Sequence, residues 1–182
     1  MHRLRRLRFR CWHERGGTQL KTPRATILID TREQNPFDFS RFEGWFAGVE
    51  KEALKIGDYS IEGLANLCVV KRKDLPDLVR SFTVERAAFV NRPKLMSNYP
   101  HRLLVITAPP SQVKSPYPHS AANPNRVFQS LIALLAGLNV PFLCTDTHEL
   151  GEEAVASYLY QTHVYHWLEN NEYGRFLADE DL

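Results

Sequence analysis

The sequence predicts an α/β protein with a mixed central β-sheet flanked by helices. In the second half of the chain, the short apolar runs 102–108 and 140–146 alternate with segments of helical pattern, which is typical of strands joined by helices. The β-branched run 24–31, which contains Asp30 near its end, adds a buried strand near the start. At 182 residues, the chain is expected to form one domain whose core needs no disulfides.

The first half of the chain is predicted to form a meander of short strands. Segment 49–54 alternates weakly and indicates an edge strand. Gly57 leads into a strand around 58–63, and segment 64–72 supplies the next. The turning points of the meander are expected at Gly57 and at 63–66.

Helices are predicted over 73–82, 83–99, 125–139 and 149–170. Pro76 is tolerated in a first helical turn, whereas Pro93 is expected to end or kink the second helix near Arg92. Asn123 is the expected N-cap of the third helix, after a long loop with five prolines over 109–124. The apolar runs 102–108 and 140–146 are expected to be buried strands.

Cysteine usage and hydropathy narrow the class of protein. Cys11, Cys68 and Cys144 are odd in number and widely spaced, which argues against a disulfide framework or a zinc knuckle. No apolar run approaches the ~18 residues of a membrane span. These features favour a cytoplasmic protein without membrane contact.

Charge divides the chain into three parts. Residues 1–24 hold eight Lys/Arg against one acid, and residues 146–182 hold one Arg against nine acids. We therefore expect a flexible basic leader over 1–23, a folded domain over 24–170 and an acidic tail over 171–182. The functional alternative for the leader is an arm that neutralises phosphates, and a weaker one is a mitochondrial presequence, which its Arg-rich, acid-poor composition fits although serine is not enriched.

Acidic side chains occur where the predicted strands end or turn. Asp30 closes one strand, Glu33 follows it, Asp58 opens another after a glycine, and Lys73 ends a third. Side chains at strand ends converge on one edge of an open α/β sheet. Carboxylates there suit Mg²⁺, which polarises phosphate and activates water, and a lysine stabilises the developing charge. The pattern indicates a phosphodiester-cutting site, although acids at turns are often merely solvated.

The order of the motifs resembles the XPF-type nuclease domain, which belongs to the restriction-endonuclease-like PD-(D/E)xK group. The motifs read "IDTRE", "GDY", "KRKxxxD", "NPNRVFQSLIALL" and "VPFL" over roughly residues 25 to 160. The residues that match the family signatures are Asp30, Arg32, Glu33, Gly57, Asp58, Tyr59, Arg72, Lys73 and Asp77. The resemblance implies a restriction-endonuclease-like mixed sheet flanked by helices.

The resemblance also implies an activity and a cofactor. The expected function is a metal-dependent, structure-specific DNA endonuclease of the repair or recombination type. Its expected cofactor is Mg²⁺ or Mn²⁺, and it frequently forms a homodimer or heterodimer through the nuclease domain. By this resemblance, Asp30, Glu33 and Asp58 are acidic metal-site residues, and Lys73 assists the attacking water.

Lys71 departs from the family signature, because the family places a metal-binding glutamate at this position. An ammonium beside a divalent cation repels it, and we expect it to pair with Asp58 instead. Three explanations follow. The chain is a degenerate, DNA-binding or partner subunit; another carboxylate, with Glu85 the best candidate, replaces the ligand; or Lys71 is an individual change in an active enzyme.

Basic residues near the predicted site indicate contacts with the DNA backbone. The run 71–94 holds seven Lys/Arg against three acids, and the plainer interpretation is a solvated helix face. The predicted DNA-binding residues are Arg32, Arg72, Arg80, Arg86 and Arg126.

A different class of function rests on the last predicted helix. His163, His166 and Glu169 are spaced three residues apart and share one helical face, so they are candidate ligands of a zinc-dependent hydrolase. The neighbouring aromatic residues favour a packing helix instead. Tyr59 is likewise expected to pack in the core.

Overall fold

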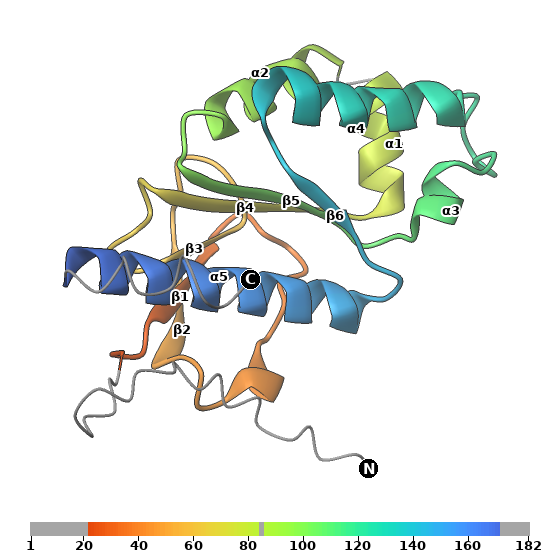
Figure 1. Ribbon diagram of the computed structural model, residues 1–182. Coiled ribbons are helices and arrows are strands. Elements are labelled where there is room, and N and C mark those ends of the chain that lie inside the picture. Colours follow the sequence, from red (N-terminus) through yellow and green to blue (C-terminus); the bar gives the residue numbers. More distant parts are fainter. Residues whose placement is uncertain (1–21, 84–85, 172–182) are drawn as a thin grey trace, which may run out of the picture.

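A six-stranded mixed β-sheet forms the centre of the computed structural model, which describes residues 22–83 and 86–171 (Figure 1). The strands are β1 Thr26–Asp30, β2 Gly48–Glu52, β3 Tyr59–Ile61, β4 Cys68–Lys73, β5 His101–Ile106 and β6 Phe142–Cys144, in the order β2-β1-β3-β4-β5-β6. The β1–β3 and β3–β4 pairs are antiparallel, and the other three pairs are parallel. The predicted mixed sheet is confirmed.

The predicted meander is only partly right. β3 and β4 form the expected antiparallel pair, but β2 pairs with β1 rather than β3. The connection from β1 to β2 includes the short 3₁₀ helix η1 (Ser40–Phe42) and is long enough to bring β2 back parallel to β1. β1 is buried apart from its first residue, and it forms hydrogen bonds with β2 on one side and β3 on the other. β2 is exposed along its length, as the prediction of an edge strand requires.

Helices cover both faces of the sheet. They are α1 Leu75–Thr83, α2 Arg86–Met96, α3 Pro110–Val113, α4 Pro124–Leu138 and α5 His148–Asn170. α5 lies along one face, and α1, α2 and α4 lie on the other (Figure 1). The predicted cap is confirmed, because the Asn123 side chain accepts hydrogen bonds from the backbone N–H groups of Asn125 and Arg126.

Pro93 does not end α2, so the first of the two predicted outcomes, an end or a kink near Arg92, is wrong. The helix continues to Met96, and the backbone N–H of Ser97 donates to the Pro93 carbonyl. Proline removes one helical hydrogen bond, but the buried Pro93 packs beside Met96 and Leu104 under α4. That burial offsets the lost bond.

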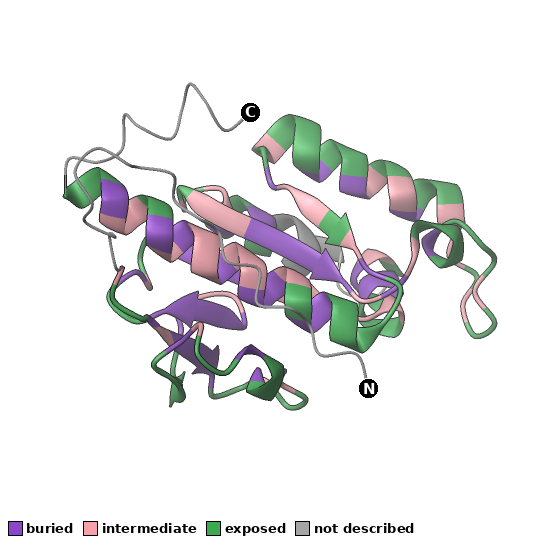
Figure 2. Cartoon of the chain, turned by 60° about the horizontal axis from the view of Figure 1, so that its bottom comes forward, coloured by how far each residue is buried: buried purple, intermediate pink, exposed green. Residues whose placement is uncertain are grey.

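Strand periodicity divides the core into two layers, which Figure 2 shows as buried strands between partly exposed helices. Val70 and Val105 face α5, whereas the adjacent Val69 and Ile106 face α1 and α4. β6 is not the buried strand that its apolar sequence predicts. It is the last strand of the described sheet, and Leu143 at its centre is 45% exposed.

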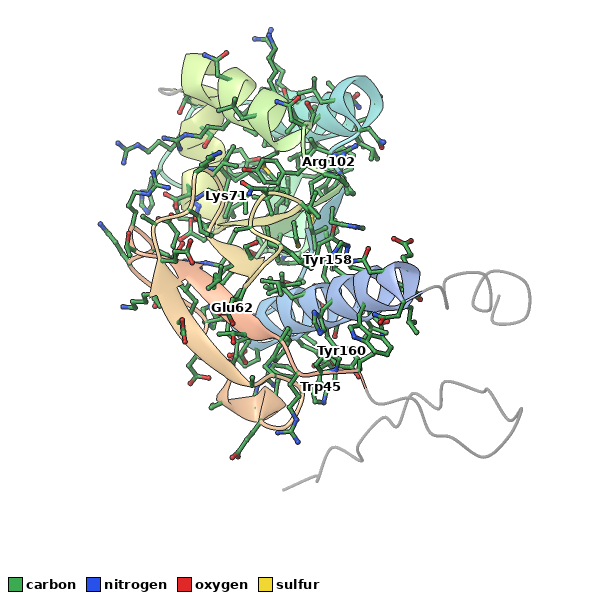
Figure 3. All side chains as sticks on the ribbon, turned by 90° about the vertical axis from the view of Figure 1, so that its left-hand side faces the viewer. Trp45, Glu62, Lys71, Arg102, Tyr158 and Tyr160 are labelled. Atoms are coloured by element: carbon green, nitrogen blue, oxygen red, sulfur yellow. The ribbon has the colours of Figure 1, made fainter. Side chains whose placement is uncertain are left out.

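The aromatic residues near the start of the domain belong to the α5 side of the core. Phe42 and Phe46 are buried, and the Trp45 ring lies 5.2 Å from that of Tyr160 on α5. Figure 3 shows Trp45 and Tyr160 together, well apart from Lys71. In the described segments, no helix has the length and apolar character needed to cross a bilayer.

Candidate active site

Three strand termini lie together at one end of the sheet, because β3 runs opposite to β1 and β4. β1 ends at Asp30, β3 begins just after Asp58, and β4 ends at Lys73. Since β3 runs antiparallel to both neighbours, the end of β1, the start of β3 and the end of β4 lie on the same edge. The convergence expected from the sequence is therefore present.

Gly57 holds Asp58 against β4. Its φ of +87° suits glycine, and a Cβ there would lie 2.4 Å from Val69 Cγ2 and 2.9 Å from the Val70 carbonyl oxygen. The next residue, Asp58, donates its backbone N–H to Val70 O at 2.8 Å and accepts from the Asp30 N–H at 2.8 Å. The glycine thus allows the close approach that places the Asp58 carboxylate between two strands.

Asp58 is paired with Lys71. The Lys71 ammonium donates to Asp58 Oδ1, and the Arg72 backbone N–H donates to Oδ2 at 2.7 Å. The carboxylate is 5% exposed and the lysine side chain 26% exposed. Burial raises the pKa of Asp58, while the Lys71 ammonium and the Arg72 N–H act against that rise. The expected Lys71–Asp58 pair is confirmed.

Asp30 has no acceptor capacity to spare. Its Oδ1 accepts from the backbone N–H and Nε of Arg32, and its Oδ2 accepts from an Arg32 guanidinium N–H and from the Leu54 N–H. These four bonds match the roughly four lone-pair sites of a carboxylate. The Arg32 side chain is the main cause of a lowered Asp30 pKa. Asp30 therefore ties the segment after β2 to the end of β1.

Glu33 completes a series of three ion pairs. Its Oε1 accepts from an Arg72 guanidinium N–H at 2.9 Å and from the Asn35 N–H at 3.0 Å. The Arg72 guanidinium also lies over the Phe37 ring, 5.5 Å from its centroid. Each of the predicted acidic residues Asp30, Glu33 and Asp58 thus has a cation of the same chain as its partner.

The three carboxylates do not fit a divalent metal in this arrangement. Within residues 22–83 and 86–171, no three His, Cys, Asp or Glu side chains are placed to hold one ion. Asp30 would have to give up hydrogen bonds, and the ammonium on Asp58 repels a divalent cation by several kcal/mol even at an effective dielectric of about 20. Glu85, the predicted substitute ligand, lies outside the described residues.

A cleft of about 660 Å³ opens over this edge of the sheet. Its charged lining residues are Asp30, Arg32, Glu33, Lys55, Asp58, Lys71, Arg72, Lys73, Asp74, Asp77, Arg80 and Arg92. Seven of these are cations and five are acids, so the described lining has a formal charge of +2. The cleft suits a polyanion better than a free metal ion.

The predicted DNA-binding arginines are only partly brought together. Arg32, Arg72 and Arg80 line the cleft, whereas Arg126 is in the first turn of α4 and is not a lining residue. The side chain of Arg86 lies outside the described part of the chain. Sequence reasoning missed Lys55 and named Arg92 only within a basic run, because nothing in their local patterns marks a cleft.

The candidate zinc site is wrong. His163 Nε2 lies 2.8 Å from the Pro23 carbonyl oxygen, and His166 Nε2 lies 2.8 Å from Asn170 Nδ2. No zinc-binding set that includes Glu169 is present among the described residues. α5 is a long covering helix, and these two histidines form hydrogen bonds with Pro23 and with Asn170 instead. Tyr59 is a core residue as expected: it is fully buried, stacks on Phe37 and accepts from the Phe37 N–H.

Two solved structures share this fold. One is XPF from Aeropyrum pernix, at 17% identity and a TM-score of 0.61, covering 75% of this chain and 64% of that chain. The other is XPF from Aeropyrum pernix in complex with DNA, at 18% identity and a TM-score of 0.60, covering 78% and 66%. The chain thus spans just under two thirds of the length of each. No curated protein matches the chain.

The family model described as the ERCC4 domain matches residues 29–176. The match includes the three strand ends, the cleft and both helical layers. Because it extends over most of the chain and the sheet agrees with the two XPF structures, the chain belongs to the ERCC4 domain family and is an XPF-type nuclease domain.

Proposed function

We propose that this chain is a DNA-binding XPF-type domain whose metal-dependent nuclease site is blocked by Lys71. The observation that carries the proposal is the Lys71–Asp58 pair, which places an ammonium where the family resemblance implies a metal-binding glutamate. Metal-dependent, structure-specific cleavage, the activity implied by the resemblance, requires a carboxylate at that position to bind a divalent metal ion. The geometry favours the degenerate alternative.

The net positive cleft supports DNA as the ligand. Its cations include Lys55 and Arg92, as well as Arg32, Lys71 and Arg72, which pair with carboxylates. A cleft lined by one excess sign of charge attracts a polyanion and releases its counter-ions. One of the two similar structures, XPF from Aeropyrum pernix, was solved in complex with DNA.

The protein is expected to bind DNA in EDTA, without any divalent metal, and to leave DNA uncut when Mg²⁺ or Mn²⁺ is added. Fluorescence anisotropy with flap, fork and plain duplex DNA measures binding, and gel analysis in Mg²⁺ or Mn²⁺ measures cleavage. Arg92→Ala removes a cleft cation and should lower the slope of log affinity against log salt by about one. Arg126→Ala, outside the cleft, is the matched control. Robust metal-dependent cutting by the unmodified protein would contradict the proposal.

The resemblance implies a homodimer or a heterodimer, and we propose a homodimer that pairs through β6. Leu143 and Leu150 are exposed by 45% and 47% and line the same hollow, which shares no residue with the DNA cleft. An edge strand with exposed apolar side chains is a ready pairing surface. Sedimentation equilibrium should show a dimer that Leu143→Lys converts to a monomer, with Leu95→Lys as an exposed control. A wild-type monomer at high concentration would rule this interface out.

A further inference from the structure

Lys71 and Lys73 are neighbours on one face of β4 but have opposite surroundings. Lys71 pairs with Asp58, whereas Lys73 forms no ion pair among the described residues. The Lys73 Nζ instead donates to Ser81 Oγ at 2.8 Å, and the Ser81 hydroxyl donates to the Asp77 carbonyl oxygen at 2.7 Å. Because the serine hydrogen is used on Asp77, Ser81 only accepts from Lys73. The lone pair of an uncharged Lys73 amine therefore stays available.

The surroundings of Lys73 raise the fraction of uncharged amine above that of an exposed lysine. Burial is the main cause of a lowered Lys73 pKa, and the charges of Lys71 and Arg92 lower it further. The carboxylates of Asp77 and Asp58 act in the opposite direction but do not outweigh these effects. An amine of this kind is a better nucleophile at neutral pH than an exposed lysine.

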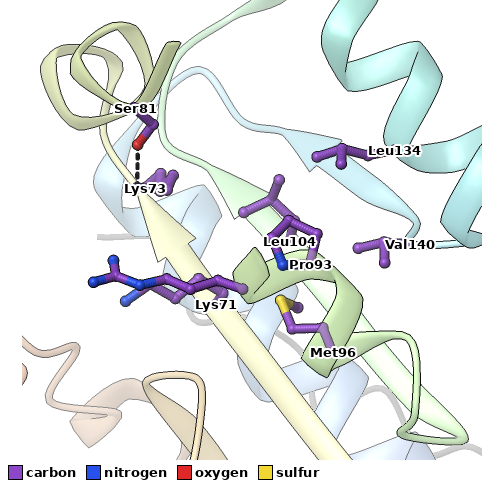
Figure 4. Close-up of a pocket in the computed structure, with 9 residues that line it drawn as sticks. Lys71, Lys73, Ser81, Pro93, Met96, Leu104, Leu134 and Val140 are labelled. Atoms are coloured by element: carbon purple, nitrogen blue, oxygen red, sulfur yellow. Dashed lines mark hydrogen bonds between the residues drawn. The ribbon is translucent and has the colours of Figure 1, made fainter. Parts of the chain in front are cut away.

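Lys73 also lies where a ligand in the cleft would meet it. It lines the basic cleft on one side and a small apolar pocket under α2 and α4 on the other. Figure 4 shows the Lys73 side chain at the mouth of this pocket with its bond to Ser81. The apolar side, formed by Met96 and Leu104 among others, keeps the side chain from being fully hydrated.

We propose that Lys73 is the nucleophile of a metal-independent lyase that cuts DNA at abasic sites. The ring-opened sugar of an abasic nucleotide carries an aldehyde, which is the group that a primary amine attacks. The proposal rests on the proposed binding of DNA in the cleft. It uses the amine that remains once metal-dependent hydrolysis is blocked.

The reaction balances without an oxidant or a metal. The Lys73 amine adds to the aldehyde carbon C1′ and water leaves, which gives a protonated imine. The imine makes the C2′ hydrogen acidic, and Asp77, which lines the same cleft, takes that proton. The electron pair forms the C2′–C3′ double bond as the C3′–O bond breaks and the 3′ phosphate leaves. Water then hydrolyses the imine and returns the amine.

Borohydride trapping tests the proposal directly. The full chain is incubated in EDTA with a duplex that contains one abasic site, and sodium borohydride reduces any imine to a stable adduct. Peptide mass spectrometry of the wild-type adduct should place the DNA on Lys73. Strand scission should fall at least tenfold in Lys73→Ala and in Lys73→Arg, but stay unchanged in Lys94→Ala, an exposed lysine on α2.

Two further measurements separate this inference from the proposed function. Anisotropy with the same abasic duplex reports binding independently of chemistry, so binding without an adduct would overturn the lyase and leave the binding proposal standing. Reductive alkylation with propionaldehyde in the absence of DNA should modify Lys73 faster than Lys94. An adduct that maps to any other amine, or equal alkylation of the two lysines, would also overturn the proposal.

Discussion

Replacing Lys71 with glutamate is expected to make the melting temperature of the domain depend on Mn²⁺ or Mg²⁺. In EDTA, Lys71→Glu should be less stable than wild type, because the new carboxylate repels the buried Asp58. Adding metal at about a hundred times its dissociation constant should return about 2.7 kcal/mol, or roughly 5–10 °C in a protein of this size. Differential scanning fluorimetry across a metal titration measures the effect.

The matched control is Lys51→Glu, which makes the same charge change on the exposed edge strand β2. Neither it nor the wild type should gain stability from metal. An equal gain in the wild type would show that Lys71 does not exclude the ion. Cleavage by Lys71→Glu is measured in parallel: a thermal gain without cutting would place the remaining obstacle at Asp30, whose carboxylate is fully occupied by Arg32 and the Leu54 N–H.

Removing the charge at position 71 should cost about 3 kcal/mol of unfolding free energy near neutral pH. Lys71→Met leaves Asp58 buried without its counter-ion, and breaking a buried pair typically costs about 3–5 kcal/mol. We expect the lower end because the Lys71 side chain is 26% exposed. Urea unfolding measures the loss. The double variant Lys71→Met/Asp58→Asn should recover most of it, and Lys51→Met is the surface control.

The loss of unfolding free energy caused by Lys71→Met should become smaller as the pH falls. The pKa of Asp58 is raised in the folded protein, so the folded state holds this proton more tightly than the unfolded state. Replacing Lys71 raises the pKa of Asp58 further, because the ammonium no longer stabilises the carboxylate. Below the folded-state pKa the carboxyl is neutral and needs no counter-ion, so the difference from wild type should be smaller near pH ~5 than near pH ~7. A constant difference would assign the loss to packing of the lysine stem instead.

The sequence predicted the features of the fold that depend on local patterns. Strand periodicity, the Asn123 cap and the Gly57 turn each identify their own element without the rest of the chain. The pairing of β2 with β1 depends on which edge of β1 remains open, and the exposure of β6 depends on its place at the end of the sheet. The continuation of α2 through Pro93 depends on burial under α4. These features depend on contacts between distant segments, so the pattern of a single segment cannot predict them.

The features of the candidate site also divide into those that local patterns predict and those that depend on the folded arrangement. Strand-end positions placed Asp30 and Asp58 on one edge. The Lys71–Asp58 pair was expected because Lys71 and Lys73, two apart on one strand, point to the same face, toward Asp58. The engagement of Asp30 by Arg32 depends on a rotamer, and the role of Lys55 depends on a loop that returns to the cleft. These features needed the folded arrangement.

The Lys71–Asp58 pair also has an evolutionary consequence. Lysine and glutamate codons differ by one base, so a point substitution would produce the glutamate that the family resemblance implies at this position. The pair keeps Asp58 neutralised and leaves the strand ends in place, so the folded scaffold on which such a substitution would act is already present. The nuclease signature is thus within mutational reach rather than erased.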